Sequence, residues 1–169
     1  MNEKDNTVRT KENMNVTIDT ANNKDISELT RLRIAYIMDD YGTISEADKR
    51  AMEEQLPGYF KRKLGKDLIA FVARADVQMV ATAYLLIIEK PANPSMQNGL
   101  VGEVLSVFTE KEYRGQGIST RLMNDLVKYA KENRLCYIDL KATEEGYSLY
   151  KKIGFEERNQ KYKDMRLKL

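Results

Sequence analysis

A short turn with two glycines separates an apolar, strand-like run from an amphipathic helical pattern. The run is Val104–Phe108, the turn contains Gly115 and Gly117, and the helical pattern starts at Ile118. Glycines lack a Cβ atom, so their backbone takes conformations that other residues avoid. The first amides of the following helix, and the positive end of its dipole, point at the same place. The sequence therefore predicts a site for an anion such as phosphate or pyrophosphate.

The residue types present restrict the chemistry. The chain has 169 residues, no histidine and one cysteine, Cys136. A zinc site of the usual ligand types, an internal disulfide and a histidine-assisted nucleophile are therefore excluded, and we expect no bound metal. We expect Cys136 to be buried in a strand without a chemical role. An acid or a base has to be Tyr, Glu, Asp, Lys or a water held by the backbone.

Charge and hydropathy argue against nucleic acid and membranes as partners. The 28 basic and 26 acidic residues leave a net charge of +2, and neither sign forms a block. The longest apolar stretch, Met79–Ile88, is much shorter than the roughly 20 residues that span a bilayer. Residues 1–15 are polar and do not resemble a signal peptide. We expect a soluble, cytoplasmic protein with a disordered leader, 1–15, and a single domain, 16–169.

Periodicity predicts an α/β domain with three layers and a mixed sheet. The expected strands are Val16–Ile18, Leu68–Arg74, Gln78–Ile88, Gly102–Thr109, Cys136–Lys141 and Tyr162–Leu167. Helices are expected after Asp25, after Ser45 with an interruption at Pro57-Gly58, from Ile118, and over Glu144–Ile153. The second and third strands should form an antiparallel hairpin, whereas the later strand–helix–strand unit should be parallel.

A second motif, Leu149-Tyr150-Lys151-Lys152-Ile153-Gly154-Phe155, lies one helix and one strand after the glycine turn. In this order and spacing, Val104–Phe108, Tyr113–Ile118 and the second motif resemble the GNAT superfamily of acyl-CoA-dependent N-acetyltransferases. The motifs cover Glu103–Phe155, and the order of elements extends the resemblance to Val16–Leu169. The resemblance implies an α/β/α fold whose mostly antiparallel sheet splays at its central strands. It also implies direct transfer of the acetyl group of acetyl-CoA to a primary amine.

The resemblance further implies where acetyl-CoA binds. Its pyrophosphate would lie on the amides of Arg114, Gly115, Gln116, Gly117, Ile118 and Ser119. Its pantetheine arm would pair with the backbone of Leu105, Ser106 and Val107, which would also donate to the thioester oxygen.

Two positions depart from the usual family pattern. Ser119 stands where Gly or Ala is usual, and its hydroxyl could donate to a phosphate. Thr143 stands where an Asn often contacts pantetheine, and it keeps one donor and one acceptor. Neither departure excludes CoA.

Two catalytic residues follow from the resemblance. Tyr150 matches the tyrosine that protonates the departing thiolate, although an ordinary core tyrosine would fit the same pattern. Glu103 is the nearest equivalent of the carboxylate that takes the amine proton through water, and a solvated glutamate at a strand end is the alternative.

The acceptor amine is the least determined part. The fold would build its pocket from Tyr36–Leu64 and Glu89–Leu100. Acidic residues (Asp39, Asp40, Glu46, Asp48) and aromatic residues (Tyr36, Tyr41, Tyr59, Phe60) there favour a small polyamine-like or aminoglycoside-like acceptor, unless they are a solvated loop and core aromatics. A CoA-binding sensor without activity, another acyl group, and a protein or peptide amine remain open. Many relatives pair through their last strands, so 162–169 could support a homodimer.

Overall fold

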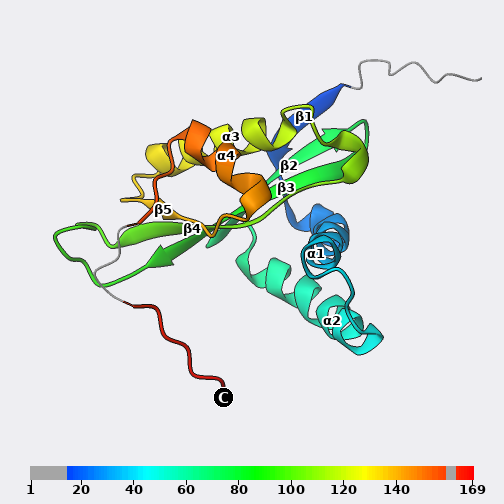
Figure 1. Ribbon diagram of the computed structural model, residues 1–169, viewed down its shortest axis with the longest axis horizontal. Helices are drawn as coiled ribbons and strands as arrows, with labels where there is room; N and C mark the ends of the chain where they lie inside the picture. Colours follow the sequence, from blue (N-terminus) through cyan, green and yellow to red (C-terminus); the bar gives the residue numbers. More distant parts are fainter. Residues whose placement is uncertain (1–14, 159–162) are drawn as a thin grey trace, which may run out of the picture.

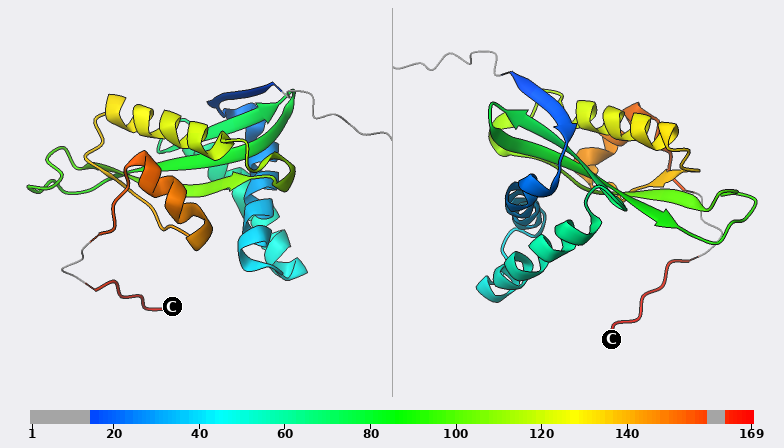
Figure 2. Two further views of the ribbon diagram at one scale, coloured as in Figure 1. Left: turned by 45° about the horizontal axis from the view of Figure 1, so that its top comes forward. Right: turned by 180° about the vertical axis from the view of Figure 1, so that it is seen from behind.

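Five strands form one mixed sheet with helices on both faces (Figure 1). The computed structural model describes residues 15–158 and 163–169. The strands are β1 (Val16–Thr20), β2 (Leu68–Ala75), β3 (Gln78–Glu89), β4 (Leu100–Thr109) and β5 (Ile138–Asp139). The helices are η1 (Asn23–Asp25), α1 (Ile26–Tyr41), α2 (Glu46–Lys63), η2 (Lys111–Tyr113), α3 (Ile118–Glu132) and α4 (Glu144–Ile153). Helices α1 and α2 lie on one side of the sheet and α3 and α4 on the other (Figure 2), which confirms the expected three-layer α/β fold.

The sheet is antiparallel from β1 to β4 and parallel between β4 and β5. Helix α3 connects β4 with β5, and such a crossover returns the chain in the same direction. The parallel ladder holds only two residue pairs, Gly102 with Ile138 and Glu103 with Asp139. After Glu103 the two strands separate, while β4 continues beside β3 to Thr109. The sheet is therefore mostly antiparallel and splayed at β4 and β5, as expected.

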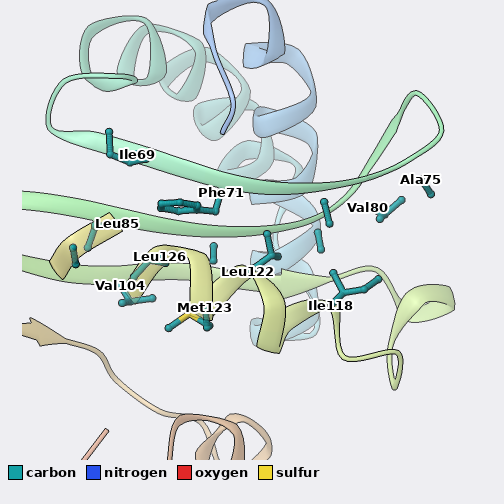
Figure 3. Close-up of a cluster of buried hydrophobic side chains, with 14 residues drawn as sticks. Ile69, Phe71, Ala75, Val80, Leu85, Val104, Ile118, Leu122, Met123 and Leu126 are labelled. Atoms are coloured by element: carbon teal, nitrogen blue, oxygen red, sulfur yellow. The ribbon is translucent and has the colours of Figure 1, made fainter. Parts of the chain in front are cut away.

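Strand β2 supplies side chains to both hydrophobic cores. Ile69, Phe71 and Ala73 join the core beneath α3, which includes Leu122 and Leu126 (Figure 3). The alternate residues Leu68, Ala70 and Val72 join the core beneath α1 and α2. Successive strand residues point to opposite faces, so a strand covered on both sides is apolar at nearly every position.

The expected interruption at Pro57-Gly58 is wrong, because α2 runs through both residues to Lys63. Proline in a helix interior costs about 3 kcal/mol relative to alanine. Leu56 and Phe60, one turn apart, are 8% and 1% exposed, and burying each such side chain contributes about 1.5–3 kcal/mol. Packing of this face therefore offsets the cost of the proline.

The expected strand Cys136–Lys141 shrinks to Ile138–Asp139. Cys136 precedes it and is exposed, with its Sγ donating to Asn98 Oδ1 at 2.8 Å, so the expectation of a buried cysteine in a strand is wrong. The apolar residues around Cys136 suggested a longer strand, but the segment pairs with β4 over only two residues.

The expected closing strand Tyr162–Leu167 is also wrong where it can be compared. Tyr162 lies outside the described residues, and residues 163–169 form no strand. Their alternation is suited to a strand, but a strand also requires a neighbouring edge to supply hydrogen bonds. Here Met165 and Leu167 are instead 94% and 82% exposed. The expected leader falls on residues 1–14, which are outside the described part, and on Asn15.

None of the described helices combines the length and the apolar character that crossing a lipid bilayer requires.

Two glycine substitutions should change stability in opposite directions. A Cβ on buried Gly102 would lie 2.6 Å from Leu85 Cδ1 and 3.0 Å from Leu135 Cδ2. Because Leu85 is fully buried, Gly102→Ala should lower the free energy of unfolding by about 1–3 kcal/mol. Gly58→Ala, inside α2 and near only the flexible end of Arg62, should raise it by about 0.5–1 kcal/mol. Urea denaturation measures both, and a neutral Gly102→Ala would contradict the packing described for β4.

Candidate functional site

A cleft of about 680 Å³ opens where β4 and β5 separate. Strand β4 forms its floor from Glu103 to Thr109. Its walls come from the C-terminal half of α1, the glycine turn with the start of α3, and α4 with the segment before it. The cleft thus joins the two sequence motifs, the strand before them and the first helix. Leu105, Ser106 and Val107 all line it, as expected for the strand.

Strand β4 carries a bulge at the centre of the cleft. Thr82 pairs with Phe108 and Tyr84 with Leu105, so two residues of β4 oppose Ala83 alone. Ser106 in the bulge has a φ of +49°, an uncommon conformation for a residue with a side chain. Its carbonyl accepts the Thr82 hydroxyl at 3.0 Å, and its Oγ accepts Arg33 Nη1 at 2.5 Å. These bonds from β3 and α1 hold the bulge, which redirects the backbone of β4.

The glycine turn has the backbone that the sequence predicts. Gly115 and Gly117 have φ values of +76° and +74°, in the region that favours glycine. Apart from the chain neighbours of each glycine, no heavy atom of the described residues lies within 4 Å of a Cβ placed at either position, so the turn is open in front. Gly117 caps α3 without a side-chain hydrogen bond, and the first turn of α3 contains no acidic residue. The first amides and the dipole of α3 are therefore available to an anion.

The side chain of Arg114 binds protein groups. Its Nε donates to Thr109 O at 2.9 Å and its Nη2 to Asp39 Oδ2 at 2.6 Å. Its guanidinium also lies over the ring of Phe108, 5.7 Å from the centroid. Arg114 therefore links the glycine turn to the end of α1 and to β4. Its backbone N–H donates to Lys111 O at 3.3 Å, so the expected contribution of this amide to the anion cradle is already used.

Two other turn residues differ in their placement. The Ser119 hydroxyl lies on the cleft but forms a 2.9 Å hydrogen bond with the Thr109 hydroxyl. Gln116 is exposed and does not line the cleft, and its Nε2 donates to Glu112 O at 3.4 Å. The structure thus brings the expected cradle residues to the cleft with the exception of the Gln116 side chain.

Tyr150 reaches the cleft from α4 and is half-buried. Its ring packs edge-on against Phe155, with centroids 6.0 Å apart. Burial raises the pKa of Tyr150, and interaction with Tyr36 adds to the rise. The hydroxyl is therefore protonated at neutral pH, as a proton donor must be. The ring has the aromatic packing of a core tyrosine, but it also faces the cleft.

Thr143 was expected to contact pantetheine, and Glu103 was expected to accept the proton of the amine. Thr143 caps α4, where its Oγ1 accepts the Gly146 N–H at 3.2 Å, so the hydroxyl proton and one lone pair are left for a ligand. Glu103 is half-buried, lines the cleft and belongs to the last pair that joins β4 to β5. It therefore lies at the point where the strands separate.

The expected acceptor residues divide into two groups. Tyr36, Asp39, Asp40 and Tyr41 line the cleft. By contrast, Phe60 is a core residue and Tyr59 packs on it. For these two residues the alternative, that the aromatic residues belong to the core, is confirmed. Glu46, Asp48 and the loop Glu89–Leu100 contribute nothing to the lining, and that loop projects beyond the sheet in Figure 2.

Burial raises the pKa of Tyr36; the Asp40 carboxylate adds to the rise and Arg33 opposes it. Asp39 is already paired, since its carboxylate lies 2.6 Å from Arg114 and 3.6 Å from Lys111. Its negative charge is therefore largely compensated.

Arg33 is a cleft residue that sequence reasoning missed. It lies three and four positions before Tyr36 and Ile37, which also line the cleft. This spacing places the three on one face of α1. A basic residue on the same face as two large side chains was the signal that could have identified it.

Across residues 15–158 and 163–169, no group of three His, Cys, Asp or Glu side chains is arranged to hold a metal ion.

Known proteins resemble the chain in sequence and in structure. Residues 66–157, more than half of the chain, match the family model of the acetyltransferase (GNAT) domain. The chain is 30% identical to a predicted acetyltransferase from Clostridium acetobutylicum, crystallised with acetyl-CoA. The comparison covers 90% of this chain and 96% of the other, with a TM-score of 0.79. A GCN5-related N-acetyltransferase from Ralstonia eutropha is 22% identical and shares the fold, with a TM-score of 0.74 over 89% and 99% of the two chains.

A shorter match is to an uncharacterized N-acetyltransferase of Methanocaldococcus jannaschii, at 34% identity over 61 residues. It covers 34% of this chain and 27% of the relative, so the chain spans about a quarter of that relative's length.

The Asp39–Arg114 link should make stability depend on pH. Arg114 holds the pKa of the Asp39 carboxyl below its usual 3.8, mainly through their hydrogen bond. A lowered folded pKa stabilises the protein above the unfolded pKa, and this contribution is lost as the pH falls through the folded value. Asp39→Asn should therefore lower the free energy of unfolding by up to about 1 kcal/mol at pH 7, and the difference should disappear as the pH falls below about 4 and through the folded value.

Urea denaturation across this pH range measures the effect. Asp40→Asn is the matched control, because Asp40 forms no ion pair within the described residues. A difference between wild type and Asp39→Asn that is the same at both ends of the range would contradict the link.

Proposed function

Since the chain belongs to the GNAT acetyltransferase family, we propose that it transfers the acetyl group of acetyl-CoA directly to a primary amine of a small molecule. One observation carries the proposal: the cleft between β4 and β5 leads from the bulge at Ser106 to the open glycine turn. A long, thin molecule with a thioester at one end and a pyrophosphate nearer the other matches that layout.

The proposed binding mode uses two kinds of backbone group. The amides of Gly115–Ser119 bind the pyrophosphate, where the φ values of the glycines and the start of α3 favour an anion. The pantetheine arm lies along β4 beside Leu105, Ser106 and Val107, where the strand has lost β5 as a neighbour. The relative crystallised with acetyl-CoA, 30% identical to this chain, supports the choice of ligand.

The proposed reaction needs no covalent enzyme intermediate. The amine nitrogen attacks the thioester carbon, the C–S bond breaks, and the sulfur leaves as a thiolate that takes a proton from Tyr150. A backbone N–H of β4 donates to the carbonyl oxygen, where negative charge develops. Glu103 receives the proton of the amine through a water molecule. Most of the acceleration comes from holding amine and thioester together.

Tyr150→Phe tests the proposed acid. Removing a positioned proton donor should lower kcat by about 100-fold, while the Kd of acetyl-CoA changes less than about threefold. Release of CoA from acetyl-CoA with a panel of amines measures both turnover and KM. A fall in kcat of less than about threefold across the pH range would remove the assignment.

The matched control is Tyr147→Phe, on the same helix. Tyr147 is exposed, lies outside the cleft and donates to Glu157, so its loss should leave kcat unchanged.

If acetyl-CoA binds to the wild type but no amine releases CoA, the chain is a CoA-binding sensor instead.

Thr120→Asp tests the site of the pyrophosphate. Thr120 is exposed and lines the cleft in the first turn of α3. A negative charge there should stabilise the free helix by about 0.3–1 kcal/mol, yet it should weaken CoA binding at least about tenfold by repelling the pyrophosphate. Thr120→Asn is the neutral control. Calorimetric titration and thermal unfolding measure the two effects, and unchanged CoA affinity in Thr120→Asp would place the pyrophosphate elsewhere.

A further inference from the structure

Arg33 places a positive charge in the acceptor side of the cleft without a carboxylate beside it. Its Nη1 donates to Ser106 Oγ at 2.5 Å, and its Cζ lies 5.2 Å from the ring centroid of Tyr36. Among the described residues, no acidic side chain lies within ion-pair distance of Arg33. Arg31, Arg74 and Arg114, by contrast, each bind a carboxylate at 3.2 Å or less.

The guanidinium keeps most of its hydrogen-bonding capacity. An arginine has five N–H donors, and within the described part of the chain only Nη1 of Arg33 meets a protein acceptor. The edge formed by Nε and Nη2 is the fork that binds two oxygens of one carboxylate or phosphate. Its position is held by the Ser106 hydroxyl and by the face of Tyr36. The fork is therefore ordered before a ligand arrives.

The cleft around Arg33 carries charges of both signs. Two acidic residues line the cleft from the same helix: Asp39 is paired with Arg114 and Lys111, whereas Asp40 forms no ion pair within the described residues. Arg33 is half-buried, so its charge is partly removed from water without compensation. Glu103 also lines the cleft. An acceptor that carries both signs of charge would therefore match the cleft better than a polyamine.

On the basis of the proposed function, we infer that the acceptor amine also carries an anionic oxygen group, a carboxylate or a phosphate, and that Arg33 binds this group. Arg33 is bonded to the bulge of β4, beside which the thioester would lie. Binding the anionic end at Arg33 would hold the amine end near that bulge. Arg33 thus selects the acceptor, whereas Tyr150 serves every acceptor alike.

The test compares kcat/KM for four series of matched chain length: ω-amino carboxylates, ω-aminoalkyl phosphates, alkylamines and diamines. Wild type should prefer one of the two anionic series over the alkylamines by at least about tenfold. Whichever anionic series is preferred identifies the anionic group of the acceptor as a carboxylate or a phosphate. Arg33→Gln should abolish that preference, because kcat/KM should fall at least about tenfold further for the preferred anionic series than for the alkylamines. Arg33→Lys should retain part of it, because the charge stays and the fork is lost.

Arg62→Gln, which changes an exposed arginine of α2 outside the cleft, is the matched control and should keep the full preference. A wild-type preference for alkylamines or diamines overturns the inference and leaves the proposed function intact. So does an Arg33→Gln variant that loses activity toward all series equally, since Arg33 would then act only on the bulge. Release of CoA with none of the amines would instead overturn the proposed function, and the inference with it.

Discussion

The early separation of β4 from β5 is the constraint on which the site depends. The two strands share only two residue pairs, and the bulge at Ser106 turns the backbone of β4 soon afterwards. A sheet that continued its parallel ladder would have used the edge of β4 for its own hydrogen bonds. Because the ladder ends at Glu103, that edge faces a cleft, and the sheet forms the floor of the cleft without losing its hydrophobic cores on either face.

Pairings between distant residues then fix the parts of the cleft relative to one another. Arg114 connects the glycine turn to Asp39 at the end of α1, and Arg33 connects the middle of α1 to the bulge. Both links tie the first helix to the second half of the chain. They account for two charged groups that sequence reasoning treated differently: Asp39 is compensated, and Arg33 is left with a free fork. The two arginines differ because the folded chain brings a carboxylate to Arg114 and a serine hydroxyl to Arg33.

Local patterns predicted most of the fold, and long-range pairings account for what they missed. The glycines at 115 and 117, the amphipathic face of α3 and the β2–β3 hairpin depend on neighbours in sequence, and all three were predicted. The contacts of Arg33 with Ser106 and of Arg114 with Asp39 join residues 73 and 75 positions apart, and no local pattern encodes them. The interruption of α2 failed because buried Leu56 and Phe60 outweigh Pro57. The closing strand failed because alternation alone does not supply a partner. Catalysis by Tyr150 and Glu103 stays a prediction.

The most direct test of the account is an NMR titration of the amide signals with acetyl-CoA. The largest shifts should fall on Gly115–Ser119 and on Leu105–Val107, the two backbone segments proposed to contact acetyl-CoA. The amide signals of the exposed face of α2 should stay unchanged. Shifts confined to other surfaces, or no shifts at acetyl-CoA concentrations that saturate a GNAT enzyme, would contradict the claim that the separation of β4 and β5 creates the acetyl-CoA site.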